Sequence, residues 1–246
     1  MIPLFKSDFS IGKSILTLNP PNPDPSKSDS VFELVKELDL STFVLVEDCL
    51  TGFLQAKKVS EELDLQLVFG LRMSLADGEG APHKVIIFAK NDAGCKLLNR
   101  LYSDAFCEGG GVLSGGSLKD NWDEDALKLV VPFYDSFIFN NFMSYSNCVF
   151  EVNFTNPTFF IESNDLPFDS LVEEIVLEYS QKKGHPTERV KSIYYKNRED
   201  FEAFQAYKCI CGRSSYGRAS TLSRPNLDHL GSREFCSESW AQKKDR

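Results

Sequence analysis

Residues 43–69, FVLVEDCLTGFLQAKKVSEELDLQLVF, predict a strand, a helix and a second strand in succession. The first four residues form a continuous apolar run, which a strand covered on both faces requires. A helix fits residues 50–63, and residues 65–69 predict the next strand. This strand–helix–strand unit indicates an α/β fold.

The same alternation recurs along the chain. Further strands are expected at residues 2–7, 85–89, 127–131, 148–154, 158–161 and 190–195, with 148–154 and 158–161 forming a hairpin. Further helices are expected after Ser30, where Glu33 completes a capping box, and at 93–106, 137–145, 166–182 and 198–208. The glycine-rich stretch 109–116 predicts a flexible loop. Repeated units without a long antiparallel series favour a parallel barrel or a doubly wound sheet, and the pattern alone does not separate them.

Length and charge constrain the number of domains and the partners. The 246 residues, 42% of them hydrophobic, suffice for one sizeable core, which we place in residues 1–212. Residues 213–246 are polar and basic and predict an extended arm, or a linker to a following domain. The net charge of −9 predicts weak or indirect contact with DNA, because duplex binding depends mainly on basic residues that neutralise phosphates.

Other sequence features predict the compartment and the state of the cysteines. Apolar runs long enough to span a bilayer are absent, as is a secretory signal, so we expect a cytoplasmic protein without membrane contact. The seven cysteines show neither Cys-x-x-Cys nor zinc-finger spacing. They are expected to be structural thiols, and no cofactor is predicted.

Four stretches resemble the polymerase-and-histidinol-phosphatase (PHP) domain of bacterial replicative polymerases of the DNA polymerase III alpha family. Residues 4–10 keep that family's Ser-Asp-aromatic-Ser motif but lack the preceding His-x-His. Residues 45–52 stand where the family has Thr-Asp-His-Gly and a Leu-x-Gly helix entry. Residues 70–72 replace Gly-Cys-Glu, and residues 192–194 replace Asp-x-His. The family's metal ligands are therefore largely lost.

Three further matches support the alignment of motifs. Residues 83–101 are similar to the family's His-Leu-x-Leu-Leu-Ala-Lys-Asn-x-x-Gly and the helix after it. Residues 200–210 resemble the Asp-Ala-x-Ala-His helix with its Cys-Ile ending, and residues 229–235 resemble the segment that leads out of the domain. The resemblance covers residues 1 to 240 and implies a distorted seven-stranded (β/α) barrel, similar to a TIM barrel.

In an intact domain of this family, histidines and carboxylates at strand ends bind up to three metal ions and hydrolyse phosphoesters. The resemblance places the degenerate metal-site positions at Leu4, Lys6, Val46, Glu47, Arg72, His83, Asp135, Ser192 and Tyr194. Leu4, Val46 and Tyr194 are not suitable ligands there. Lys6 and Arg72 place positive charges where ions would lie. We expect Lys6, Glu47 and Arg72 to form an ion-pair network in place of the metals, because a buried charge needs a partner.

The resemblance implies a domain with no catalytic residues and no metal. Its role would be to support a replicative polymerase and to dock the proofreading exonuclease or other polymerase parts during DNA replication. The alternative is a metal-dependent phosphoesterase or exonuclease with a rebuilt site. Its candidate ligands are Asp8, Glu47, Asp48, Asp135 and His83. A barrel that binds a small ligand has no support from particular residues.

An aromatic cluster is the candidate docking surface. Its members are Phe133, Tyr134, Phe137, Phe139, Phe142 and Tyr145. Exposed aromatic side chains are frequent anchors at protein interfaces. The competing interpretation is that this stretch packs a helix onto the barrel.

Overall fold

The computed structural model describes residues 1–22, 28–212 and 228–244. The chain divides into two compact units. Unit 1 comprises residues 1–67, 164–166 and 191–246, and unit 2 comprises residues 68–163 and 167–190. Each unit is therefore assembled from separate stretches of sequence.

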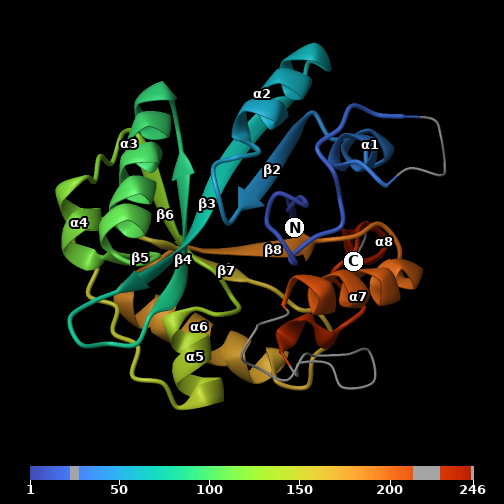
Figure 1. Cartoon of the computed structure of the whole chain (residues 1–246). Helices are drawn as coiled ribbons and strands as arrows, with labels where there is room; N and C mark the ends of the chain where they lie inside the picture. The colour runs from blue at the N-terminus through green and yellow to red at the C-terminus, as the bar shows by residue number, and fades with distance from the viewer. Residues whose placement is uncertain (23–27, 213–227, 245–246) are drawn as a thin grey trace. The chain divides into compact units, whose positions relative to one another are not determined.

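Unit 1 contains the first two strands and the C-terminal helices (Figure 1). Its elements are β1 (Ile2–Phe5), α1 (Val31–Glu37), β2 (Thr42–Glu47), α2 (Phe53–Glu62), the 3₁₀ helix η2 (Arg198–Asp200), α7 (Phe201–Cys211), the 3₁₀ helix η3 (His229–Gly231) and α8 (Ser237–Lys244). The predicted capping box at the start of α1 is confirmed. The Ser30 side chain accepts from the backbone of the first turn, and Glu33 accepts from the Ser30 N–H.

Unit 2 contains the middle of the chain, drawn largely in green and yellow in Figure 1. Its elements are β4 (His83–Ala89), α3 (Asp92–Ser103), the π-helical turn η1 (Asp104–Glu108), β5 (Val112–Ser114), α4 (Gly115–Asp120), β6 (Leu127–Val131), α5 (Phe137–Ser144), β7 (Thr158–Ile161) and α6 (Asp169–Lys183). Gly184 ends α6 in a left-handed conformation with φ +73°, which glycine adopts readily.

The strands form one mixed sheet with the order β2-β1-β8-β7-β6-β4-β3-β5. Two of them, β3 (Gln66–Ala76) and β8 (Thr187–Ile193), contribute residues to both units. An additional β2–β3 pairing closes seven strands into a barrel, and β5 is an extra strand beside β3. The predicted α/β barrel is thus confirmed.

The barrel is mixed, whereas the sequence pattern favoured parallel strands. β1–β2, β6–β7 and β7–β8 are parallel, but β4 is antiparallel to both β3 and β6. Only residues 77–82 separate β3 from β4, and so short a connection suits antiparallel neighbours, since parallel strands need a longer crossover.

Two local predictions in unit 2 are wrong. Residues 148–154 form no strand, because side chains bind their backbone. The Asn141 side chain bonds the Cys148 N–H, and Asp77 bonds the Glu151 N–H. The glycine-rich stretch is not wholly a loop either, since it contains β5 and the start of α4. The Ser114 hydroxyl caps α4 by accepting from the Ser117 N–H.

The described residues after the predicted boundary at 212 contain helix α8, which the sequence analysis did not predict. Phe235 and Trp240 are buried in unit 1, and the Trp240 indole donates to the Met1 carbonyl at 3.2 Å. The domain boundary itself stays a prediction, because residues 213–227, which include Arg213, lie outside the described residues.

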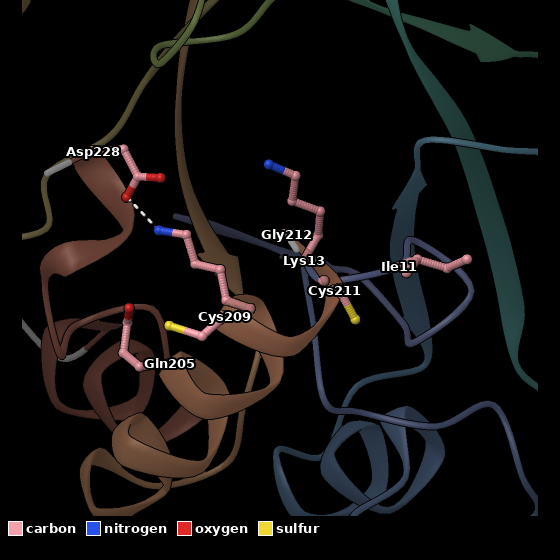
Figure 2. A pocket seen from close by; sticks show the side chains of 9 residues that line it. Ile11, Lys13, Gln205, Cys209, Cys211, Gly212 and Asp228 are labelled. Carbon is pink, nitrogen blue, oxygen red and sulfur yellow. Dashed lines mark hydrogen bonds and ion pairs between the residues drawn. The ribbon is translucent and has the colours of Figure 1, made fainter. Parts of the chain in front are cut away.

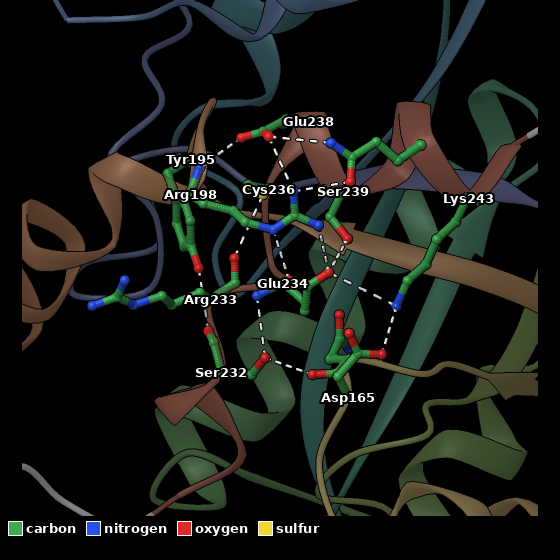
Figure 3. A network of polar contacts seen from close by, with 12 residues as sticks. Asp165, Tyr195, Arg198, Ser232, Arg233, Glu234, Cys236, Glu238, Ser239 and Lys243 are labelled. Carbon is green, nitrogen blue, oxygen red and sulfur yellow. Dashed lines mark hydrogen bonds and ion pairs between the residues drawn. The ribbon is translucent and has the colours of Figure 1, made fainter.

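A polar network fixes this C-terminal stretch within unit 1 (Figure 3). The Arg198 guanidinium donates twice to Glu234, at 2.8 and 3.0 Å, and once to Glu238 at 3.0 Å. Ser239 also donates to Glu234, and Lys243 donates to Asp165 at 2.9 Å. The hydrogen bonds from Arg198 lower the pKa of Glu234 to about 2. Paired, geometrically fixed charges of this kind hold α8 in place.

Among the helices in the described part of the chain, none combines the length and apolar composition that a membrane crossing requires.

Candidate functional site

In unit 1, the ends of β1 and β2 bring together the first set of degenerate positions. These strands are parallel neighbours, so the residues that follow them lie at the same edge of the sheet. Lys6 comes directly after β1, and its ammonium donates to Asp48 Oδ1 at 2.8 Å. The Lys6 side chain is only 4% exposed. Leu4 and Val46 are buried apolar residues beside this pair in sequence.

Glu47, the last residue of β2, is fully buried and is held by serines. Its Oε1 accepts from the Ser7 N–H at 2.9 Å and from the Ser7 hydroxyl at 2.5 Å, and its Oε2 accepts from the Ser10 hydroxyl. Burial raises the pKa of Glu47, while Lys6 and the serine hydrogen bonds lower it in part. Both carboxylate oxygens are therefore already bonded to protein donors.

The serine partners of Glu47 were missed from the sequence, although the signal was present. Ser7 and Ser10 are the two serines of the Ser-Asp-aromatic-Ser motif. The Ser10 hydroxyl also accepts from the Asp48 N–H at 2.8 Å, which fixes the turn after β2. The motif thus positions the carboxylates at this strand end.

The two degenerate positions near the end of β8 are Ser192 and Tyr194. Ser192 is buried within β8. The Tyr194 ring stacks on Phe235 with centroids 5.3 Å apart, and on Phe204 at 6.1 Å. Tyr194 is thus part of an aromatic stack in unit 1.

In unit 2, Arg72 on β3 donates to Asp135 Oδ2 at 2.5 Å. Asp135 lies in the turn after β6 with φ +61°, and its carbonyl accepts from the Lys84 N–H at 2.8 Å. The backbone therefore holds Asp135 where its carboxylate meets the guanidinium.

His83, the first residue of β4, is buried among aromatic rings. The centroids of Phe137 and Phe150 each lie 5.7 Å from the imidazole in edge-to-face geometry. Neither ring nitrogen has a hydrogen-bond partner among the described residues. Burial lowers the pKa of His83 to about 4, and Asp77 and the Ala81 backbone offset this only slightly. His83 is therefore neutral at physiological pH.

The predicted network of Lys6, Glu47 and Arg72 stays a prediction, although each of these side chains has a polar partner. Lys6 pairs with Asp48 in unit 1, Arg72 pairs with Asp135 in unit 2, and serines bind Glu47. In the described ranges, no group of three or more His, Cys, Asp or Glu side chains is arranged to hold a metal ion. The residues present do not fit the family's metal centre, because the carboxylates of this chain at these positions bind ammonium, guanidinium and hydroxyl groups.

Most of the predicted aromatic docking surface is interior. Phe133, Tyr134, Phe137 and Phe139 are buried, and the Tyr134 hydroxyl donates to Asp169 at 2.9 Å. Phe142 is 40% exposed and Tyr145 is 94% exposed. Of this predicted cluster, Phe142 and Tyr145 at the end of α5 are the members exposed to a partner.

Comparison with known proteins gives few similarities. No protein-family model matches the chain, and no curated protein matches it. One similar solved structure is a protein from Bifidobacterium adolescentis, described provisionally as a metal-dependent phosphoesterase. The identity is 10% and the TM-score is 0.45, over 77% of this chain and 87% of that chain.

Proposed function

We propose that this chain is a non-catalytic PHP-like domain of a DNA polymerase III alpha-like replicative polymerase. It serves as a scaffold and as a docking site for the proofreading exonuclease or other polymerase parts. The main support is the buried ion pair between Lys6 and Asp48, at strand ends where the resemblance implies metal ligands. A positive side chain at this point repels a metal ion and neutralises the carboxylate that would bind it.

Two further contacts support the same proposal. Serine donors occupy both oxygens of Glu47, and Arg72 binds Asp135. Metal-dependent hydrolysis needs an ion with open coordination positions that activates water. The side chains at these positions are instead arranged to stabilise the fold.

A metal-dependent phosphoesterase with a rebuilt site remains the second candidate, and one observation favours it. Asp8 Oδ1 is buried and has no hydrogen-bond partner among the described residues. Burial raises the pKa of this carboxyl. The other proposed ligands of that site are less suitable, since Asp48 and Asp135 are in ion pairs and His83 is enclosed by phenylalanines.

Metal content and hydrolytic activity of the purified full chain distinguish the two candidates. Elemental analysis for zinc, manganese and magnesium is expected to give far less than one ion per chain. Nitrophenyl phosphate and single-stranded DNA should not be hydrolysed when these metals are added. Stoichiometric metal together with turnover that is lost in Glu47→Ala would establish the phosphoesterase and refute the scaffold proposal.

The docking role has its own test at the end of α5. Phe142→Ser with Tyr145→Ser should weaken retention of the cognate exonuclease or polymerase in a pull-down, because exposed aromatic anchors contribute strongly to binding. Leu54→Ser is the matched control, since Leu54 is an exposed apolar residue on α2 of unit 1. Unchanged retention by the correctly folded double variant would exclude this surface.

A further inference from the structure

A pocket of about 210 Å³ lies in unit 1, between the loop after β1 and the C-terminal half of α7 (Figure 2). Ile11 and Lys13 line it from the loop, and Lys208 and Asp228 line it on the other side. Sites for small organic ligands typically measure ~300–1,000 Å³. This pocket is smaller, and its size suits one side chain of a larger partner.

The wall of the pocket is built by close backbone packing. Gly12 has φ +73°, and a Cβ at this position would lie 2.9 Å from the Cβ of Cys211. The loop therefore lies directly against the end of α7, and glycine is required by both conformation and space. Gln205, another lining residue, is buried and donates to the Leu230 carbonyl at 2.7 Å. The pocket is largely preformed.

Of the two lysines among the described lining residues, one is in an ion pair. The Lys208 ammonium donates to Asp228 at 2.6 Å, so that pair is neutral overall. The Lys13 N–H donates to the Ser10 carbonyl at 2.9 Å, whereas its ammonium forms no hydrogen bond or ion pair with another described residue. Figure 2 shows the Lys13 side chain across the pocket from Asp228. A ligand with a negative group would balance the Lys13 charge.

An exposed apolar residue lines the same pocket. Ile11, which lines the pocket, is 74% exposed. Ile210 is 61% exposed and lies on the last turn of α7, between the lining residues Cys209 and Cys211. Ile11 and the Lys13 ammonium together form a mixed apolar and positive surface, which suits a partner with a matching pair of groups.

We propose that this pocket binds an acidic side chain of a partner protein, with a neighbouring apolar residue of that protein packing against Ile11. The proposal rests on the docking role proposed above and names the chemistry of one docking segment. A nucleic-acid ligand is less favoured, because a backbone of phosphates draws on several basic residues, and the described lining residues offer one ammonium outside an ion pair.

The test is an NMR titration of the full chain with two short peptides. The probes are acetyl-Leu-Glu-Leu-amide and acetyl-Leu-Gln-Leu-amide, which differ only in the charge of the central residue. The glutamate peptide should give saturable shifts of the backbone amides in residues 11–13 and 208–212. The glutamine peptide should bind several-fold more weakly, since it lacks the group that balances Lys13.

Two variants connect the shifts to the pocket. Lys13→Gln should reduce binding of the glutamate peptide to the level of the glutamine peptide. Lys57→Gln is the matched control, because Lys57 is an exposed lysine of the same unit on α2. It should bind like the unsubstituted protein.

Three results would overturn the proposal: no shifts at these residues, equal binding of both peptides, or full binding by Lys13→Gln. Tighter binding of deoxyadenosine monophosphate than of the glutamate peptide would also overturn it, by making the pocket a nucleotide site. Failure here is distinguishable from failure of the proposed function. A negative titration of a metal-free, inactive protein leaves the scaffold role standing, whereas metal-dependent turnover refutes that role whatever the peptides do.

Discussion

Lys6 carries a positive charge with almost no access to water, so its contribution to the stability of the fold depends on its carboxylate partner, Asp48. Replacing Lys6 by methionine keeps much of the side-chain volume but leaves Asp48 without its ammonium and Glu47 without a nearby positive charge. Breaking a buried pair from one side costs roughly 3–5 kcal/mol. We expect Lys6→Met to lower the free energy of unfolding by about 3 kcal/mol in urea denaturation, since Asp48 keeps some exposure.

The matched control for this variant is Lys58→Met. Lys58 lies 3.9 Å from Glu62 in an exposed ion pair on α2, and such pairs contribute about 0–1 kcal/mol. Equal effects of the two substitutions would show that the Lys6–Asp48 pair has no special role in stability.

We expect His83 to make the free energy of unfolding depend on pH. Its pKa is about 4 in the folded protein and near 6.5 when unfolded, so the unfolded chain binds more protons between these values. Stability from this residue is fully present above pH 6.5 and decreases as the pH falls to 4. The total is roughly 3 kcal/mol, from about 1.4 kcal/mol per pKa unit.

The measurement compares urea denaturation of the unsubstituted protein and His83→Phe across this pH range. The variant cannot titrate at residue 83, so its stability should depend less on pH. Glu47 has a raised pKa and changes stability in the opposite sense, but it is present in both proteins and cancels in the difference. An identical pH dependence in both proteins would refute the assignment.

The sequence identified most of the chemically important residues but not their partners. The pairing of Lys6 with Asp48, and not with Glu47, depends on side-chain directions at the end of β2, where one residue of shift reverses the face. Burial of His83 between Phe137 and Phe150 depends on chain segments that are distant in sequence. Neither outcome follows from motif spacing.

At the scale of helices and strands, local rules succeeded where local chemistry decides. The capping box at Ser30 fixes the start of α1. The left-handed glycine at position 184 fixes the end of α6. They failed where distant groups take over. An added Cβ at Gly115 would lie 1.5 Å from Asp77 Oδ1, so a larger residue there would displace the Asp77 side chain.

The antiparallel pairing of β3 and β4 had a signal that the sequence analysis did not use. Asp77-Gly78 follows β3, and Asp-Gly between apolar stretches is a strong hairpin signal. Gly70 interrupts the apolar run and led to an expected end at Phe69, whereas the strand continues to Ala76. Recognition of this turn would have predicted a mixed barrel.

For the whole molecule, the C-terminal residues prove to be part of a core. Deletion of residues 213–246 would remove Phe235 from its stack on Tyr194, and would remove both carboxylates bound by Arg198. We expect this truncation to abolish cooperative unfolding of unit 1, measured by circular dichroism and by loss of dispersed NMR signals.

The matched control is Lys244→Gln, which changes the charge near the end of α8 and keeps Phe235, Glu234 and Glu238. It should retain a cooperative transition. A folded truncated protein with unchanged stability would mean that the C-terminal stretch is dispensable, as an extended arm would be.

The division of the chain into two units was not predictable from composition. Unit 1 is formed from three separate stretches, so no linker or change in composition marks its limits. The α/β class was predictable, because each strand and each helix leaves its pattern of apolar residues within one short stretch of sequence.

The contact between Met1 and Trp240 has a consequence for the order of folding. Unit 2 has all its residues once Val190 has been synthesised, whereas unit 1 waits for Phe235 and Trp240 at the far end of the chain. Contacts between such distant residues form slowly, because a long loop has to close first. The chain has two tryptophans, Trp122 in unit 2 and Trp240 in unit 1. The single variant Trp122→Phe therefore keeps Trp240 as a fluorescent reporter of unit 1, and Trp240→Phe keeps Trp122 as a reporter of unit 2. We expect the fluorescence change of unit 1 to appear last during refolding.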